Sequence, residues 1–349
     1  MVSVEAESSM PGRAGETVLR VEGLRTEFLT RRGAVTAVRD LDLELRHAET
    51  LGLVGESGCG KSVTALSILR LIPPRMGRIA GGRVLYEGRN LADLAEGEMR
   101  RVRGGDIAMI FQEPMTALNP VLTIGQQIVE TILMHEAVSP REARDRAIEM
   151  LRLVQISEAE RRIDAYPHMF SGGMRQRAMI AMALACNPKV LIADEPTTAL
   201  DVTIQAQILE LMQRLQQMLG TAIIMITHDL GVIAEVAHRV AVMYAGRKVE
   251  EASVLSLFDT PLHPYTRGLL KAIPDLDVSG TEAGKRPRLN AIEGTVPALH
   301  QLPNGCAFAP RCAAATAKCH EADPPLAQKK QGHWVACWNV PEMAAGQVS

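Results

Sequence analysis

The chain has 349 residues, of which 47% are hydrophobic and 22% are charged, and its formal net charge is −2. This length allows one large domain or two ordinary ones with a buried core. The nearly balanced charge gives no reason to expect a nucleic-acid partner, and an aromatic content of 3% argues against a platform for stacking bases.

The N-terminal residues 1–16 lack a basic start followed by an apolar run, so we expect a disordered segment rather than a secretory signal. No apolar run is long enough to cross a membrane, since stretches such as residues 178–186 have about half the length needed. We therefore expect a cytosolic chain, in which thiols stay reduced and disulfides are rare.

The periodicity of the sequence changes along the chain. Residues 17–50 and 80–112 alternate between apolar and polar positions, which predicts an antiparallel β subdomain. Residues 116–185 follow a helical pattern, and residues 186–260 return to alternating strands and helices, as in a parallel sheet. No motif is repeated, so we expect a single domain of this kind.

The clearest motif lies in residues 50–74, where an apolar strand pattern runs into GESGCGKS and a helical pattern follows. The match to G-x-x-x-x-G-K-S in this setting predicts a phosphate-binding loop, in which backbone N–H groups point at anionic oxygens. Lys61 is expected to reach the β- and γ-phosphates, and Ser62 to place its hydroxyl on Mg²⁺. The residues assigned to the loop are Gly55, Glu56, Ser57, Gly58, Cys59, Gly60, Lys61, Ser62 and Val63.

A second motif, KVLIADEPTTALD at residues 189–201, is a short apolar strand that ends in two carboxylates. Asp194 stands at the carboxyl end of this strand, where α/β sheets hold their ligands, and it suits a contact to Mg²⁺. Glu195 follows and is expected to face an attacking water molecule.

The segment FSGGMRQR at residues 170–177 resembles the signature motif of the ABC-type ATPases, and companion motifs follow the order of that family. Gln112 resembles the Q-loop residue, residues 199–201 the D-loop, and His228 the switch histidine. Phe28 resembles the aromatic residue that stacks on adenine, although a place in a strand core is the simpler alternative. The resemblance covers residues 17–260 and implies an α/β P-loop NTPase fold with an antiparallel β subdomain and a helical subdomain at 116–185.

The resemblance also implies a mechanism for ATP hydrolysis. Lys61 and a Mg²⁺ ion held through Ser62, Gln112 and Asp194 would neutralise charge on the γ-phosphate. Glu195 would orient or deprotonate the water, and His228 would contact the γ-phosphate. The residues implied to face the nucleotide of a partner subunit are Ser171, Gly172, Gly173 and Asp201; Asp201 also suits a helix cap.

Residues 261–349 form an extension rich in proline and small residues. Its segments 263–270 and 294–312 resemble the C-terminal region of peptide-importer ATPases, and Met174 in the signature resembles the first of their two ATPase subunits. The resemblance implies an ATPase at the cytoplasmic face of the membrane that powers uptake of dipeptides or oligopeptides. Its implied partners are a second ATPase subunit, two permeases and an extracytoplasmic peptide-binding protein.

Two other functions stay open on the sequence. One is an ATPase for import of nickel or another small solute, because cargo choice lies in other subunits. The other is a soluble ABC-type ATPase that acts on nucleic acid or the ribosome. The single domain and the lack of basic excess disfavour the latter.

Four of the six cysteines fall in the extension, at Cys306, Cys312, Cys319 and Cys337. Four thiols in a short proline-rich segment suit Zn²⁺ or an iron–sulfur cluster, although unliganded buried thiols are the simplest alternative. Tight C-x2-C pairs, common in zinc ribbons, are missing here. The resemblance to peptide-importer ATPases implies a [4Fe–4S] cluster at these cysteines.

Overall fold

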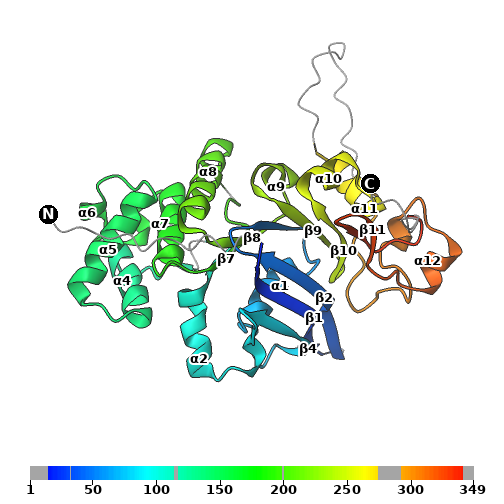
Figure 1. The fold of residues 1–349 in the computed structure, drawn as a ribbon, viewed down its shortest axis with the longest axis horizontal. Coiled ribbons are helices and arrows are strands. Elements are labelled where there is room, and N and C mark those ends of the chain that lie inside the picture. Colours follow the sequence, from blue (N-terminus) through cyan, green and yellow to red (C-terminus); the bar gives the residue numbers. More distant parts are fainter. Residues whose placement is uncertain (1–14, 32, 114–116, 199, 274–291, 341–349) are drawn as a thin grey trace, which may run out of the picture.

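The computed structural model describes residues 15–31, 33–113, 117–198, 200–273 and 292–340. Most of the N-terminal segment expected to be disordered lies outside these residues. The described chain forms two β-sheets, a group of helices at one end and a C-terminal part at the opposite end (Figure 1).

The smaller sheet is antiparallel and has the order β2-β1-β4-β5. Its strands are β1 (Thr17–Thr30), β2 (Gly33–Arg46), β4 (Gly77–Tyr86) and β5 (Arg89–Asn90). Buried and exposed positions alternate along the second half of β2, as expected for strands with one face on the core. The alternation over residues 17–50 thus predicted the antiparallel strands β1 and β2 correctly.

The larger sheet has the order β11-β12-β10-β9-β3-β8-β7-β6. It contains β3 (Thr50–Val54), β6 (Ile107–Ile110), β7 (Val190–Asp194), β8 (Ala222–Thr227), β9 (Arg239–Tyr244), β10 (Arg247–Ser253), β11 (Ala327–Lys330) and β12 (His333–Val335). Strands β9, β3, β8, β7 and β6 are parallel to one another. β3, β7 and β8 are buried along their whole length, because helices and the smaller sheet cover both faces.

The expectation of an antiparallel subdomain over residues 80–112 was wrong in its second half. Residues Glu96–Arg101 form helix α2, and Ile107–Ile110 pairs in parallel with β7 as the edge of the larger sheet. The run IAMI is too short to tell the two sheet types apart by periodicity, and its pairing depends on a strand 83 residues away in sequence, since Ile107 pairs with Val190.

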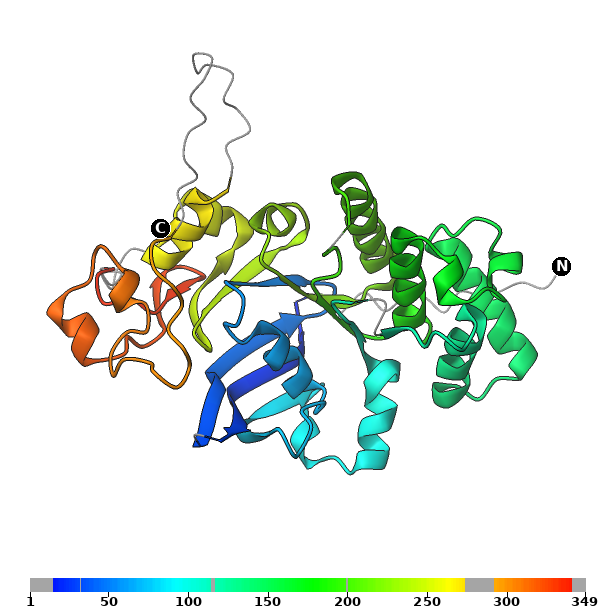
Figure 2. The same ribbon diagram turned by 180° about the vertical axis from the view of Figure 1, so that it is seen from behind.

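Helices follow the strands of the larger sheet and fill the segment between β6 and β7. They are α1 (Lys61–Ile68), α4 (Ile124–His135), α5 (Pro140–Leu153), α6 (Ala159–Arg162), α7 (Gly172–Leu184), α8 (Val202–Leu219), α9 (Leu230–Val236), α10 (Val254–Asp259), α11 (Pro264–Lys271) and α12 (Ala317–Glu321). α4 to α7 form the helical end of the molecule, on the left in Figure 1 and on the right in Figure 2. Capping boxes at Thr123 and Ser139 start α4 and α5.

The C-terminal part continues the larger sheet rather than standing apart from it. β12 pairs antiparallel with β10, where Glu250 faces Val335 and Glu251 faces Trp334. α11 also returns to this region, so the described residues after 260 pack on the end of the sheet away from α4 to α7 (Figure 2).

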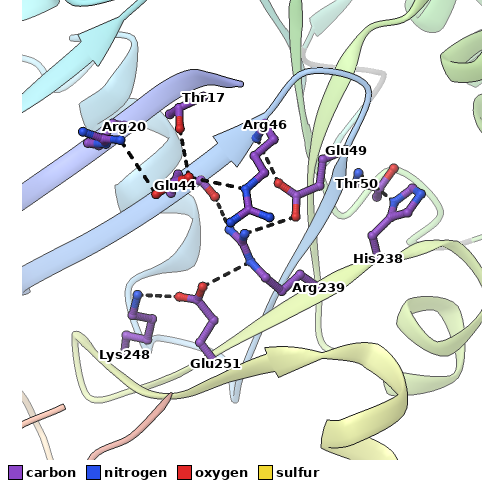
Figure 3. A network of polar contacts seen from close by, with 10 residues as sticks. All are labelled: Thr17, Arg20, Glu44, Arg46, Glu49, Thr50, His238, Arg239, Lys248 and Glu251. Atoms are coloured by element: carbon purple, nitrogen blue, oxygen red, sulfur yellow. Dashed lines mark hydrogen bonds and ion pairs between the residues drawn. The ribbon is translucent and has the colours of Figure 1, made fainter. Parts of the chain in front are cut away.

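A polar network ties the smaller sheet to the larger one at the entry to β3 (Figure 3). Arg239 of β9 pairs with Glu49 at 3.3 Å and with Glu251 of β10 at 3.1 Å, and it also donates to the backbone oxygen of Glu44. The side chain of Arg239 is 14% exposed. Burying a charge is costly unless it is paired, and these ion pairs anchor the segment that leads into the strand before the phosphate loop.

Candidate active site

The loop between β3 and α1 contains backbone conformations with positive φ that glycine adopts readily. Gly55, Gly58 and Gly60 all have positive φ values, of 152°, 78° and 105°. A side chain at Gly55 would collide with the backbone oxygen of Met243, and one at Gly60 would come within 2.7 Å of the oxygen of Ala37. The tight packing against neighbouring backbone therefore requires glycine at both positions.

Lys61 folds back into this loop. Its Nζ donates to the backbone oxygen of Gly55 at 2.7 Å and of Glu56 at 3.2 Å, and it lies 3.8 Å from Sγ of Cys59. The side chain of Cys59 is fully buried, and this burial raises the pKa of its thiol. The lysine thus places a positive charge inside the curl of the loop, where an anionic group would be held.

Ser62 and Asp194 meet at the start of α1 and the end of β7. The Ser62 hydroxyl donates to Oδ1 of Asp194 at 3.0 Å. Burial raises the pKa of the Asp194 carboxyl, while the hydrogen bond from Ser62 acts in the opposite direction. A hydroxyl and a carboxylate side by side form the oxygen donor set that Mg²⁺ prefers, so these residues fit the expected metal.

Glu195 is held by hydrogen bonds from three side chains. Its carboxylate accepts from Thr198 Oγ1 at 2.9 Å and from Gln112 Nε2 at 3.0 Å, and it lies 3.2 Å from Nδ1 of His228. Burial alone would raise the pKa of Glu195, but the hydrogen bonds from Thr198 and His228 outweigh it and lower the pKa. The carboxylate therefore stays charged and able to accept a proton or orient water.

The backbone of Glu195 is strained, with φ at +47°, a region that non-glycine residues rarely adopt. Its N–H donates to the backbone oxygen of Ile226 in β8 at 2.9 Å, which fixes the turn after β7. Strain of this kind persists where the surrounding structure determines one side-chain position.

These groups converge because they follow neighbouring parallel strands. The loop follows β3, Gln112 follows β6, Asp194 ends β7 with Glu195 directly after it, and His228 follows β8. Carboxyl ends of parallel strands meet at one edge of a sheet, where ligands bind. The structure thus brings Lys61 and Ser62 together with the four residues from the other strands; Thr198 is the member that the sequence did not single out.

In the structure, the signature residue Ser171 and the D-loop residue Asp201 cap the N-termini of two helices. Ser171 accepts from the N–H of Met174 at 3.3 Å as N-cap of α7, and Asp201 accepts from the N–H of Ile204 at 3.0 Å as N-cap of α8. The hydrogen bonds of both side chains are thus local, and the cap expected at Asp201 is confirmed. A side chain at Gly173 would come within 2.9 Å of Ile204, so the two helix starts are closely packed. Ala199 of the D-loop lies outside the described residues.

Phe28 lies apart from this group. It belongs to β1 and pairs with Gly77 of β4, and a side chain at Gly77 would come within 3.1 Å of both Phe28 and Ile72, which follows α1. Because the phosphate loop precedes α1, the structure places Phe28 near the other end of that helix. Its contact with adenine stays a prediction.

The four extension cysteines line one small cavity together with His263, Phe308 and Trp338. All four thiols are free. Burial raises the pKa of Cys306 to about 11 and also raises the pKa values of Cys312 and Cys337. Within the part of the chain that the structure describes, no group of three or more potential ligands is close enough to hold one metal ion.

Two residues of the extension also reach the phosphate loop, and the sequence reading missed both. Tyr265 and Arg311 each contact Glu56. Tyr265 lies in segment 263–270 and Arg311 in segment 294–312, and the sequence analysis used both segments only for their resemblance to peptide-importer ATPases. Neither residue carries a local pattern that indicates a partner so far away in sequence.

Among the helices described, none combines the length and the apolar character needed to cross a membrane.

Comparison with known proteins identifies two family regions. Residues 38–198 match the ABC transporter family, and residues 249–319 match the oligopeptide/dipeptide transporter C-terminal region. The first region contains the phosphate loop, Gln112, Ser171 and Glu195, and the second contains Tyr265 and Arg311.

Curated relatives match nearly the whole chain. A probable peptide ABC transporter ATP-binding protein of Sinorhizobium fredii is 54% identical over 94% of this chain and 96% of its own length. An oligopeptide transport ATP-binding protein of Bacillus subtilis is 51% identical over 95% of this chain and 99% of its own length.

Solved structures share the fold of the ATPase part. A dimeric bacterial ABC transporter cassette is similar with a TM-score of 0.60 and 28% identity, covering 68% of this chain and 98% of that one. The same cassette has been solved as a dimer bound to ADP and phosphate after hydrolysis. With this fold, a phosphate loop and a charged carboxylate at the sheet edge, the chain belongs to the ABC transporter ATP-binding proteins that carry the oligopeptide/dipeptide C-terminal region, and it is an ATPase.

Proposed function

We propose that this ATPase powers the uptake of dipeptides or oligopeptides through a membrane ABC importer. The observation that carries the proposal is the match of residues 249–319 to the oligopeptide/dipeptide transporter region, joined to an ATPase site in the same chain. Relatives named for peptide transport share 50–54% of their residues with it. In this proposal residues 17–260 form the ATPase domain and residues 261–349 the peptide-importer extension.

The geometry at the sheet edge supports a catalytic role for each of these residues in the proposal. Lys61 binds the β- and γ-phosphates after its Nζ leaves the backbone oxygens that it now contacts. Ser62, Asp194 and Gln112 would hold Mg²⁺, which would supply positive charge against the phosphates. Glu195 orients the attacking water and accepts its proton, and His228 bridges this carboxylate to the γ-phosphate.

Ser171, Gly172, Gly173 and Asp201 serve the nucleotide of a second ATPase subunit in this proposal. Helix α7 starts at the SGG sequence, so its N-terminus presents free N–H groups to an anion. The relative solved as a dimer supports a pair of ATPase subunits. Two permeases and an extracytoplasmic peptide-binding protein complete the importer, and the chain docks at the cytoplasmic face of the membrane.

We propose further that the four extension cysteines hold a [4Fe–4S] cluster. All four line one cavity, yet no three potential ligands in the described residues are placed for a single ion. A cluster suits this arrangement better than Zn²⁺, because each thiolate binds a different iron atom and the sulfur atoms need not meet at one point. Burial raises the thiol pKa values and so disfavours the free thiolates, and the positive charge of a bound cluster would offset that cost.

Anaerobic purification followed by iron, sulfide and zinc analysis tests the cluster. We expect about four irons and four sulfides per chain, with a broad visible absorption band. One zinc per chain would assign the cysteines to a structural zinc site. A folded chain without metal would show that the four cysteines are unliganded thiols.

Uptake tests the transport function. We expect cells with the complete importer to accumulate a labelled dipeptide or oligopeptide, and cells with the Glu195→Gln variant to accumulate none. Glu210→Gln, at an exposed position on α8, is the matched control and should transport normally. Uptake of nickel in place of peptide, with the same dependence on Glu195, would overturn the peptide assignment and leave the ATPase assignment intact.

A further inference from the structure

Glu56, the second residue of the phosphate loop, is held by two side chains from the C-terminal extension. Its backbone N–H donates to Oη of Tyr265 at 2.8 Å. Its carboxylate accepts from Nη1 of Arg311 at 2.6 Å and from Nη2 at 3.0 Å, which is a two-point guanidinium–carboxylate pair. Arg311 is 255 residues away in sequence, so two segments that are far apart in the chain meet at the nucleotide site.

Arg311 is fixed by further contacts on the side away from Glu56. Its Nε donates to the backbone oxygen of Glu293 at 3.0 Å, and Nη2 donates to that of Ile292 at 3.3 Å. Nη1 lies 3.4 Å from the hydroxyl of Tyr244, and the guanidinium carbon is 5.9 Å from the ring centre of Phe308. Only 4% of the Arg311 side chain is exposed, so its guanidinium charge is balanced by the Glu56 carboxylate rather than by solvent.

A carboxylate in this loop is unfavourable for the binding of an anion. Glu56 belongs to the turn that surrounds the phosphates, and its backbone oxygen accepts from Nζ of Lys61 at 3.2 Å. An uncompensated negative charge there would repel polyphosphate and attract the lysine away from it. The pair with Arg311 removes the repulsion and fixes the carboxylate on the side of the extension.

We propose that Arg311 is a positioning residue of the nucleotide site: it neutralises and orients Glu56, so that the extension sets the affinity of the phosphate loop for MgATP. The inference rests on nucleotide binding at this loop, as proposed above. Arg311 ends the short 3-10 turn Ala309–Arg311 and directly precedes Cys312. Arg311 therefore connects the segment that carries Cys312 to the phosphate loop.

The test compares MgATP binding by calorimetry to the full-length wild-type chain, Arg311→Gln, and Arg311→Gln combined with Glu56→Gln. We expect the single variant to bind roughly 5- to 20-fold more weakly, within the usual range for coupling between sites. The double variant should return close to the wild-type affinity, because it removes the unpaired carboxylate. A residue that only supports the fold would show no such rescue.

Arg267→Gln is the matched control, since Arg267 belongs to the same extension and donates to the backbone oxygen of Pro261. It should bind MgATP as the wild type does. In the assembled importer, Arg311→Gln should raise KM for ATP and leave kcat nearly unchanged, because the repulsion acts equally on bound substrate and transition state.

Two results would overturn the inference. The first is that Arg311→Gln binds MgATP as tightly as the wild type. The second is that the double variant binds as weakly as Arg311→Gln although both variants keep wild-type unfolding curves. Failure of the wild-type chain to bind MgATP is a different outcome, because it contradicts the proposed function rather than the role of Arg311.

Discussion

The phosphate loop and the C-terminal extension meet at Glu56, but they are built in different ways. The loop needs a local backbone shape, which glycines within eight residues provide. The extension contributes Tyr265 and Arg311 from positions 209 and 255 residues away from Glu56. The comparison teaches that a site recognised from one short motif can still depend on side chains that no motif includes.

The two regions also differ in what holds them together. The strands around the loop are buried apolar runs, whereas the extension depends on buried polar groups and a small aromatic cluster. Glu250 of β10 is fully buried and accepts from the N–H groups of Leu262 and His263 at 2.6 and 3.1 Å and from His333 at 2.6 Å. Breaking such buried pairs is costly, so the extension should be the more sensitive part of the fold.

The largest effect is expected at the loop. Lys61→Ala should lower ATP hydrolysis about 100-fold or more, since it removes a charge aimed at the phosphates. Its unfolding curve should stay close to that of the wild type. Phosphate release at saturating ATP measures this, with Lys189→Ala, which breaks a surface pair with Glu87, as control. Full activity in Lys61→Ala would contradict the role of the phosphate loop in ATP hydrolysis.

An intermediate effect is expected in the extension on acidification. Burial lowers the pKa of His263 to about 4, from 6.5 in an exposed chain. Between these values the unfolded chain binds a proton that the folded chain refuses, so stability falls as the pH drops from 6.5 to 4. The loss should approach roughly 3 kcal/mol. The lowered pKa of the buried Glu250 carboxyl adds a further loss of stability below its ordinary pKa of 4.5.

Urea unfolding followed by tryptophan fluorescence measures this loss, because both tryptophans, Trp334 and Trp338, lie in the extension. His263→Asn keeps an acceptor for the N–H of Tyr265, now bound by Nδ1 at 3.0 Å, and removes the titration. The variant should show a flatter pH dependence over this range. An unchanged slope would show that another group causes the acid sensitivity.

The smallest effect is expected where the two regions meet. Tyr265→Phe removes the acceptor for the N–H of Glu56 and leaves the pair with Arg311 in place. Loss of one hydrogen bond of this kind costs about 1 kcal/mol, so MgATP affinity should fall roughly 5-fold. Tyr166→Phe, at an exposed tyrosine in the helical part, should bind normally. A loss larger than that of Arg311→Gln would make Tyr265 the main support of the loop.

Much of the catalytic site follows from the sequence, because spacing along one chain fixes which groups share a strand end. The glycines, Lys61 and Ser62 belong to one strand–loop–helix unit, and Asp194 ends an apolar run that reads as a buried strand. Gln112 and His228 required a family resemblance, since a single polar residue after a strand has no distinguishing pattern. The structure adds the hydrogen bonds that join both of them to Glu195.

The parts that the sequence did not reveal depend on contacts between distant segments. β6 was assigned to the antiparallel sheet because a run of four residues shows no partner. β12 joins β10 through a pairing that periodicity cannot place. Thr198 and Arg311 become functional candidates only when folding brings them to Glu195 and Glu56.

The most direct measurement is ATP turnover by the assembled importer, with the wild-type chain and with Glu195→Gln. The nucleotide that stays bound to each form is then identified. The account predicts that the variant releases almost no phosphate and keeps bound ATP, because the carboxylate that orients water is lost while Lys61, Ser62 and Asp194 still hold the nucleotide. Turnover near the wild-type rate in Glu195→Gln would contradict the assignment of this carboxylate and of the site built around it.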